Sequence, residues 1–220
     1  NATEAGCRGS FPRSAIMIRL SRAWMIGLLL ALVSANHCFA ERYLTVAEAE
    51  KLCFSQGDRF ETRIVRFSAE ERKAIAKRSS VKVFNLGNRV SLAYRGTNFL
   101  GVLIVDHVLA KHEIIDYGVA VSPDGKVLQV EILEFRESHG ADVRSAKWRA
   151  QFVGKTSGAP LKLNDDIYNI SGATLSCRHV TEGVKRVLAT YDLVVRPQLG
   201  LAGRLPDLGN AAKPCVGAPQ

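Results

Sequence analysis

The chain has 220 residues, 47% of them hydrophobic and 23% charged, and a formal net charge of +9 at pH 7. This composition is ordinary for a globular protein and provides enough apolar residues for one well-formed core. The basic residues do not cluster with aromatic residues as they do in nucleic-acid-binding modules, so no nucleic-acid partner is predicted. The positive charge would help docking onto an acidic partner or an anionic cofactor, and the alternative is a solvated, mildly basic surface.

The first 40 residues are predicted to be upstream sequence followed by a secretory signal peptide. Met17 is followed by Arg19 and Arg22, by the uncharged stretch 23–35, and by small residues up to Ala40. This layout predicts export to a periplasmic or other extracytoplasmic location, with cleavage after Ala40. The apolar run is short for a membrane span, which needs about 20 residues. A retained membrane anchor is the alternative.

Three cysteines follow residue 40: Cys53, Cys177 and Cys215. In an oxidising compartment an odd number leaves at least one thiol unpaired. Cys177 is predicted to be a small buried apolar residue, whereas Cys215 could pair with Cys53 or with another molecule. Neither the number nor the spacing of the cysteines supports a metal site, and none is predicted. No Ser-His-Asp, Walker or Rossmann pattern occurs, so no catalytic residues are predicted.

The capping-box spacing, a Ser or Thr followed three residues later by Glu, occurs twice in the N-terminal part of the chain. It predicts short helices over 45–54 and 72–78, with Thr45 and Ser68 as their caps. Residues 61–67 between them alternate in polarity as a β-strand does.

From residue 81 onward the apolar residues follow a period of two, which predicts a series of β-strands. The turn residues at 85–88 and 122–125 predict hairpins. Residues 141–153 are predicted to form a helix with Trp148 and Phe152 facing inward. The predicted strands cover 81–84, 90–94, 99–109, 114–122 and 127–135, with a short one at 161–163. The fold class is therefore α+β: a single domain with an antiparallel sheet flanked by helices.

The segment Ser171–Cys177 opens a further helix and could hold a phosphate. A helix start leaves backbone N–H groups without partners and carries partial positive charge, so it favours an anion. Gly172 and Ala173 would let a phosphate approach the backbone, and Thr174 supplies a hydroxyl. The alternative is that Ser171 or Thr174 is simply the N-cap of this helix.

The residues after the motif follow the helical period of 3.6. The predicted buried face consists of Leu175, Val180, Val184, Val187, Leu188 and Tyr191. The predicted polar face consists of Arg178, Glu182, Lys185 and Arg186.

The run Ser171-Gly172-Ala173-Thr174 followed by Leu175-Ser176 resembles the flavinylation motif of the FMN-binding domain family. Three more segments occur in the order typical of the family: Lys111–Glu113, Glu131–Glu137, and Trp148 with 152–155. The family includes periplasmic flavin subunits of the sodium-pumping NADH:quinone oxidoreductase and of Rnf complexes, and small secreted flavoproteins. The resemblance covers roughly residues 98–190. It departs from the usual pattern at Tyr168, where the family usually has Asp, and at Ser138-His139, where members often have Thr-Pro.

The resemblance implies FMN as the cofactor. In the family, a flavin transferase joins the FMN phosphate to the hydroxyl of the last motif Thr, which is Thr174 here. Trp148 could stack on the flavin ring or belong to the core, and Lys155 could neutralise the phosphate or be a solvated side chain. The cofactor-binding residues that it implies are Ser171, Gly172, Ala173, Thr174, Leu175, Glu137, Ser138, Gly140, Trp148 and Lys155.

The predicted function is that of an exported FMN-binding electron-transfer carrier, with membrane or periplasmic redox proteins as partners. The first alternative is a flavin-dependent reductase with reversibly bound FMN, and the second is a non-redox envelope binding module. The predicted organisation is the leader 1–40, N-terminal helices and strands over 41–97, the FMN-binding domain over 98–195, and a disordered tail over 196–220.

Overall fold

The computed structural model describes residues 41–136 and 140–201. The predicted signal peptide, Glu137, Ser138, Cys215 and the tail beyond residue 201 lie outside the described residues. Among the helices of the described part, none combines the length and the apolar character needed to cross a membrane.

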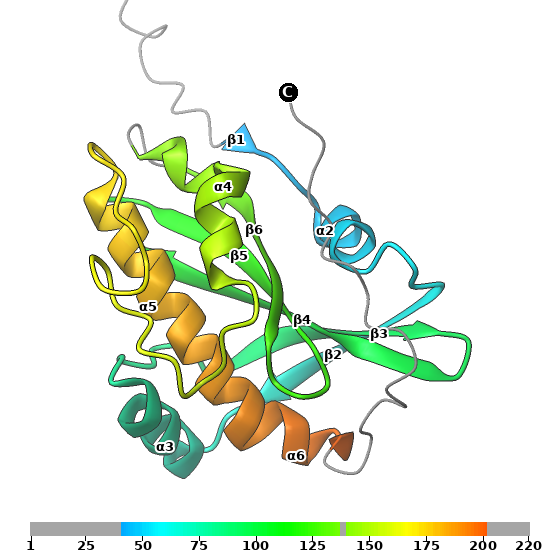
Figure 1. The fold of residues 1–220 in the computed structure, drawn as a ribbon. Helices are drawn as coiled ribbons and strands as arrows, with labels where there is room; N and C mark the ends of the chain where they lie inside the picture. Colours follow the sequence, from blue (N-terminus) through cyan, green and yellow to red (C-terminus); the bar gives the residue numbers. More distant parts are fainter. Residues whose placement is uncertain (1–40, 137–139, 202–220) are drawn as a thin grey trace, which may run out of the picture. The chain divides into compact units, whose positions relative to one another are not determined.

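The sheet is six-stranded, and every neighbouring pair of strands is antiparallel. Its spatial order is β1-β6-β5-β4-β3-β2 (Figure 1). The predicted α+β class with an antiparallel sheet is confirmed. The strands are β1 (Glu41–Arg42), β2 (Arg59–Arg66), β3 (Gly87–Arg95), β4 (Asn98–Leu109), β5 (Ile114–Val121) and β6 (Val127–Phe135).

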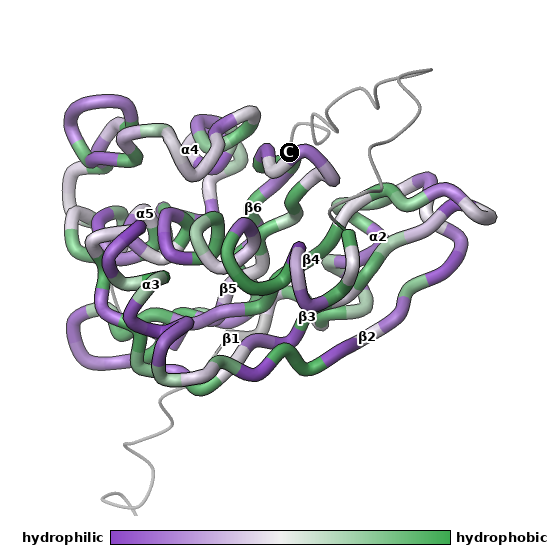
Figure 2. The backbone as a smooth tube through the Cα atoms, turned by 90° about the horizontal axis from the view of Figure 1, so that it is seen from below, coloured by the Kyte–Doolittle hydropathy of each residue, from purple (hydrophilic) through white to green (hydrophobic). Residues whose placement is uncertain are grey.

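Helices cover both faces of this sheet (Figure 1). On one face α3 (Ala69–Ser79) and α5 (Thr174–Thr190) pack over the larger apolar core. On the other face α2 (Val46–Cys53) covers a smaller core that contains Phe54 and Leu103. Strands that are buried on both faces tend to be continuously apolar. Figure 2 accordingly shows long hydrophobic stretches in the central strands, whereas much of edge strand β2 is hydrophilic.

The two predicted capping boxes are confirmed. The Thr45 hydroxyl accepts a hydrogen bond from the Glu48 N–H at 3.2 Å, and the Glu48 carboxylate accepts one from the Thr45 N–H at 2.7 Å. Ser68 and Glu71 make the same reciprocal pair at the start of α3. These local interactions satisfy backbone groups that the helix itself leaves free, which is why sequence spacing alone could place both helices.

The predicted strand over 81–84 and the hairpin turn over 85–88 are wrong. Residues 81–86 form an extended connection with no strand partner, and β3 begins at Gly87. This connection is held by long-range contacts instead of a sheet ladder: the Phe67 N–H donates to the Leu86 carbonyl at 2.9 Å. Its alternation in polarity therefore reflects alternating exposure of a loop.

The predicted helix over 141–153 is broken into three short pieces: η1 (Ala141–Arg144), α4 (Ala146–Arg149) and η2 (Ala150–Phe152). Ser145 has an extended conformation, with φ −53° and ψ 122°, and it separates the first two pieces. Trp148 and Phe152 nevertheless face inward as predicted. The predicted strand at 161–163 is reduced to one isolated bridge between Leu163 and Ile167.

Helix α5 continues directly into a π-helical segment, η3 (Tyr191–Val195), and then into α6 (Arg196–Gln198). The first residues of the predicted disordered tail, 196–201, are therefore ordered. The reason is burial: Val194 and Val195 are fully buried, and Leu201 is 2% exposed.

Candidate functional site

Helix α5 begins without a side-chain cap. Its N-cap residue is Ala173, and no side chain accepts a hydrogen bond from its first turn, in contrast to α2 and α3. The expectation that Ser171 or Thr174 serves as N-cap is therefore wrong. The first-turn N–H groups point out of a 17-residue helix without a side-chain partner, which leaves the partial positive charge of the helix start available to an anion.

The Thr174 hydroxyl is held in place by a neighbouring amide. Asn169 Nδ2 donates a hydrogen bond to Thr174 Oγ1 at 3.0 Å, so the hydroxyl proton remains free to be donated elsewhere. The Asn169 Oδ1 atom is buried and has no hydrogen-bond partner. Sequence reasoning missed Asn169. The available signal was an Asn five residues before a helix-start Thr, a distance that a tight turn can close.

The motif residues around Thr174 differ in their exposure. Ala173 is buried, with 2% of its surface exposed, whereas Ser171 and Gly172 are exposed. Gly172 has φ +85°, and no atom lies within 4 Å of the position that a Cβ would take, so the space beside it is open. Leu175 is 41% exposed, which corrects its predicted place on the buried face. The buried position in this turn belongs to Cys177, a free thiol whose pKa is raised by burial.

The loop after β6 meets the first turn of α5 at Gly140. A Cβ on Gly140 would lie 2.5 Å from Ser176 Oγ and 3.7 Å from Ala173 Cα, and its φ is +89°. A side chain at this positive φ would be strained, and the Ser176 side chain would have to move to make room for it. The structure therefore brings Gly140 and the Ser171–Thr174 motif together. Glu137 and Ser138, just before Gly140 in the chain, lie outside the described residues.

Trp148 lies in the core, 4% exposed, with its ring edge-on to Phe152 at a centroid distance of 5.1 Å. Its Nε1–H donates to the Tyr168 carbonyl at 2.8 Å, and the Tyr168 N–H donates to Gln151 Oε1 at 2.6 Å. Trp148 was expected either to stack on the flavin ring or to belong to the core, and its contacts are those of a core residue. It positions the chain three residues before Ser171 and leaves the Tyr168 side chain 78% exposed.

Lys155 is engaged in an ion pair. Its Nζ lies 2.8 Å from Asp166 Oδ2, and the same carboxylate accepts the N–H groups of Leu161 and Lys162 at 3.2 and 2.7 Å. Lys155 thus stabilises the loop before the motif, and its charge is already matched within the protein. Although burial opposes the charged form, these hydrogen bonds hold the pKa of Asp166 below its ordinary value.

Acid is expected to remove the contribution of Asp166 to stability. Because the folded-state pKa is lower than the unfolded value of about 3.9, the contribution is complete above about pH 4 and is lost as the pH falls through the folded pKa. The difference in unfolding free energy between wild type and Asp166→Asn should therefore shrink between about pH 7 and about pH 3, as measured by urea denaturation. Asp165→Asn, at a 57% exposed carboxylate, is the control. A difference that is constant with pH would contradict the assignment.

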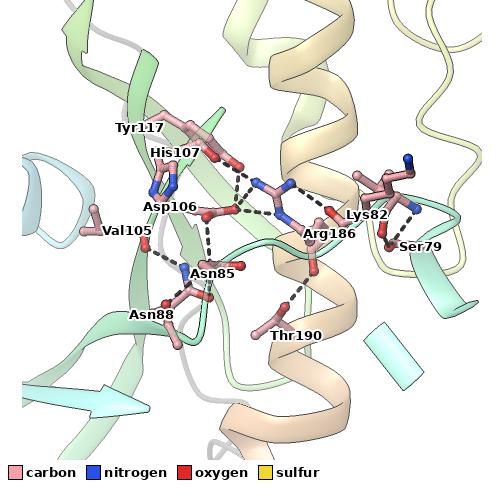
Figure 3. A network of polar contacts seen from close by, with 12 residues as sticks. Ser79, Lys82, Asn85, Asn88, Val105, Asp106, His107, Tyr117, Arg186 and Thr190 are labelled. Atoms are coloured by element: carbon pink, nitrogen blue, oxygen red, sulfur yellow. Dashed lines mark hydrogen bonds and ion pairs between the residues drawn. The ribbon is translucent and has the colours of Figure 1, made fainter. Parts of the chain in front are cut away.

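A buried polar network fixes α5 against the sheet (Figure 3). Arg186 Nε and Nη2 donate to Asp106 Oδ2 on β4 at 3.1 and 2.8 Å, and the Tyr117 hydroxyl on β5 donates to the same oxygen at 2.8 Å. Asp106 is 3% exposed and Tyr117 is fully buried. Burial, reinforced by the Asp106 charge, raises the pKa of Tyr117 far above its ordinary value, so this phenol stays a proton donor. Arg186 is 8% exposed and so does not belong to the predicted polar face.

Comparison with known proteins agrees with the motif. The model of the FMN-binding domain family matches residues 111–189. A component of the proton-translocating ferredoxin:NAD(+) oxidoreductase complex of Clostridium ljungdahlii is 35% identical over 81 residues, covering 34% of this chain and 44% of that protein. This chain thus spans less than half the length of the curated relative that it matches. The crystal structure of Shewanella oneidensis NqrC has 18% sequence identity and a TM-score of 0.49, over 68% of this chain and 87% of that chain.

The matched residues run from the turn between β4 and β5 to the last turn of α5. They include the Ser171–Thr174 motif, Asn169, and Gly140, which the structure has brought to the start of α5. The match of residues 111–189 therefore agrees with the predicted resemblance to the FMN-binding domain family, and it supports FMN as the cofactor.

Proposed function

We propose that this protein is an exported electron carrier whose FMN is joined to Thr174 through a phosphoester. The observation that carries the proposal is the Thr174 hydroxyl, which Asn169 holds at the start of a long helix that no side chain caps. In forming the ester, Thr174 Oγ1 bonds to phosphorus and loses its proton. A flavin transferase would supply the activated flavin phosphate and its leaving group.

The residues at this helix start fit a phosphate group. The first-turn N–H groups of α5 are available as donors, and the helix dipole favours a negative charge beside them. Open space beside Gly172 leaves room for a ligand next to the backbone, and the buried Asn169 Oδ1 still lacks a partner. Because Lys155 Nζ lies 2.8 Å from Asp166 Oδ2, we assign its charge to this ion pair and not to the phosphate.

An electron carrier needs bound flavin and access for partners, and it needs no substrate pocket. When bound, FMN supplies the redox chemistry, while the protein holds and orients it. The partners of this chain are proposed to be membrane or periplasmic redox proteins. The name of the Clostridium ljungdahlii relative, a subunit of an oxidoreductase complex, supports that class of partner.

Thr174→Ala is expected to abolish covalent flavin when the full chain is produced with an export-competent flavin transferase. The wild-type protein should carry the mass of FMN less one water in an intact-mass spectrum, and should keep its yellow colour after acid denaturation. Thr174→Ser keeps a hydroxyl and should retain flavin. Thr97→Ala, in the exposed turn between β3 and β4, is the matched control and should behave as wild type.

Two results would contradict parts of this proposal separately. An unmodified wild-type mass together with flavin absorbance that is lost on denaturation would leave FMN binding intact and refute the ester. A colourless protein under native conditions would refute flavin binding in this chain altogether.

A further inference from the structure

The connection between α3 and β3 presents two large apolar side chains to the solvent. Along residues 81–86 exposure alternates, so that Val83 and Asn85 point inward while Lys82, Phe84 and Leu86 point outward. Phe84 is 80% exposed and Leu86 is 68% exposed. An apolar residue at an exposed position is common, but two on the same side of one short segment form an outward apolar edge.

This outward edge is held in a fixed conformation by buried groups. Asn85, which lies between the two apolar residues, donates from Nδ2 to Asp106 Oδ1 at 3.2 Å (Figure 3). Its neighbour Leu86 accepts a hydrogen bond from the Phe67 N–H. The exposure of Phe84 and Leu86 is thus a consequence of the anchoring of Asn85 on the buried carboxylate.

The same connection is also tied to α5. Arg186 Nη1 donates to the Lys82 carbonyl at 3.3 Å, and Nη2 of the same guanidinium donates to the His107 carbonyl at 2.8 Å. The backbone at Lys82 is therefore fixed, while its side chain, two residues before Phe84, is exposed.

The charged residues in the sequence around this edge are all basic. From residue 72 to residue 105 there are seven basic residues and no acidic one. Within the described ion pairs, none involves Lys77, Lys82 or Arg89, all of which are exposed. The seven are Arg72, Lys73, Lys77, Arg78, Lys82, Arg89 and Arg95.

We propose that the Phe84–Leu86 edge is a peripheral membrane contact, in which both side chains enter the interface of an anionic lipid bilayer. An aromatic and an aliphatic side chain flanked by lysine and arginine match the boundary between acyl chains and anionic headgroups. A protein partner is the less favoured occupant, because two projecting side chains provide only a fraction of the area of a stable protein interface. The contact does not depend on flavin attachment, so its test is independent of Thr174.

The test is co-sedimentation of the purified exported protein with vesicles. We expect binding to vesicles of phosphatidylcholine mixed with phosphatidylglycerol, little binding to phosphatidylcholine alone, and loss of binding at high salt. The Phe84→Ser/Leu86→Ser variant should lower the partition coefficient at least tenfold. Lys82→Gln should lower it about fivefold, the effect of one cation near an anionic surface.

The matched control is Leu52→Ser, at a 42% exposed leucine of α2 on the other face of the sheet, which should bind as wild type. Unchanged thermal unfolding of each variant shows that folding is intact. Equal binding by wild type and the double variant, or binding that ignores lipid charge, would overturn the proposal. Absence of vesicle binding, with a crosslink from residue 84 to a protein, would also overturn it and identify a protein contact instead.

Discussion

Arg186→Leu is expected to lower the free energy of unfolding by about 3–5 kcal/mol, as found when one partner of a buried ion pair is removed. Stability is lost because the Asp106 carboxylate, which is 3% exposed, would remain in the core without its cationic partner. Only neutral hydrogen-bond donors would then contact it. The Lys82 and His107 carbonyls would each lose a donor as well. Urea denaturation measures the change.

Two variants make this expectation specific. Lys185→Leu changes the neighbouring cation, which has no described ion pair, and should alter stability by less than about 0.5 kcal/mol. In Asp106→Leu/Arg186→Leu no charge is left unpaired, so much of the lost stability should return. A single variant that costs no more than Lys185→Leu would show that the pair contributes little to the folded state.

The role of Arg186 also shows where sequence reasoning ends. Its helical position predicted a solvated face, and only the fold reveals Asp106, 80 residues earlier in the chain, opposite it. The features predicted correctly depend on local sequence: the capping boxes at Thr45 and Ser68, and the strands β3 to β6, which were predicted from apolar residues with a period of two. The loop at 81–86 has that same period for another reason, the anchoring of Asn85, and was therefore misinterpreted.

The residues of the candidate site fall into the same two groups, those predictable from local sequence and those fixed by tertiary contacts. The motif at Ser171–Thr174 was recognisable from its residue order, and the start of α5 followed from helical periodicity. The contact of Gly140 with Ser176 and the bond from Asn169 to Thr174 depend on how turns close in three dimensions. The family resemblance implied a cofactor role for Trp148 and Lys155, with a core tryptophan and a solvated lysine as the alternatives. Their partners, the Tyr168 carbonyl and Asp166, could not be known before the loops between η2 and α5 were placed.

Gly183→Ala is expected to destabilise the protein by about 1–3 kcal/mol, the usual cost of overpacking a core. At this position α5 almost touches β5: a Cβ would lie 2.2 Å from Tyr117 Oη and 2.8 Å from Tyr117 Cζ. Alanine has the better intrinsic helix propensity by up to about 1 kcal/mol, which would favour the variant if space were available. Space is not available, because Tyr117 is fully buried and its hydroxyl is bonded to Asp106. Helix α5 must therefore shift away from the sheet.

If this shift of α5 causes the loss of stability, then Gly183→Ala should cost less unfolding free energy in a variant that lacks the Tyr117 ring. In a Tyr117→Ala background the obstructing ring is absent, so the added cost of Gly183→Ala should fall below about 1 kcal/mol, a coupling that a double-mutant cycle measures. Gly158→Ala is the control: its Cβ would meet only Thr156 Oγ1 at 3.8 Å, and stability should not change measurably. Because α5 also carries Thr174 at its first residue, Gly183→Ala should lower the yield of flavin-bearing protein as well, with Tyr117 removal restoring it. Full stability in Gly183→Ala would mean that α5 can move away from β5 at no cost, which would contradict the conclusion that the Asp106–Tyr117–Arg186 network fixes α5 against the sheet.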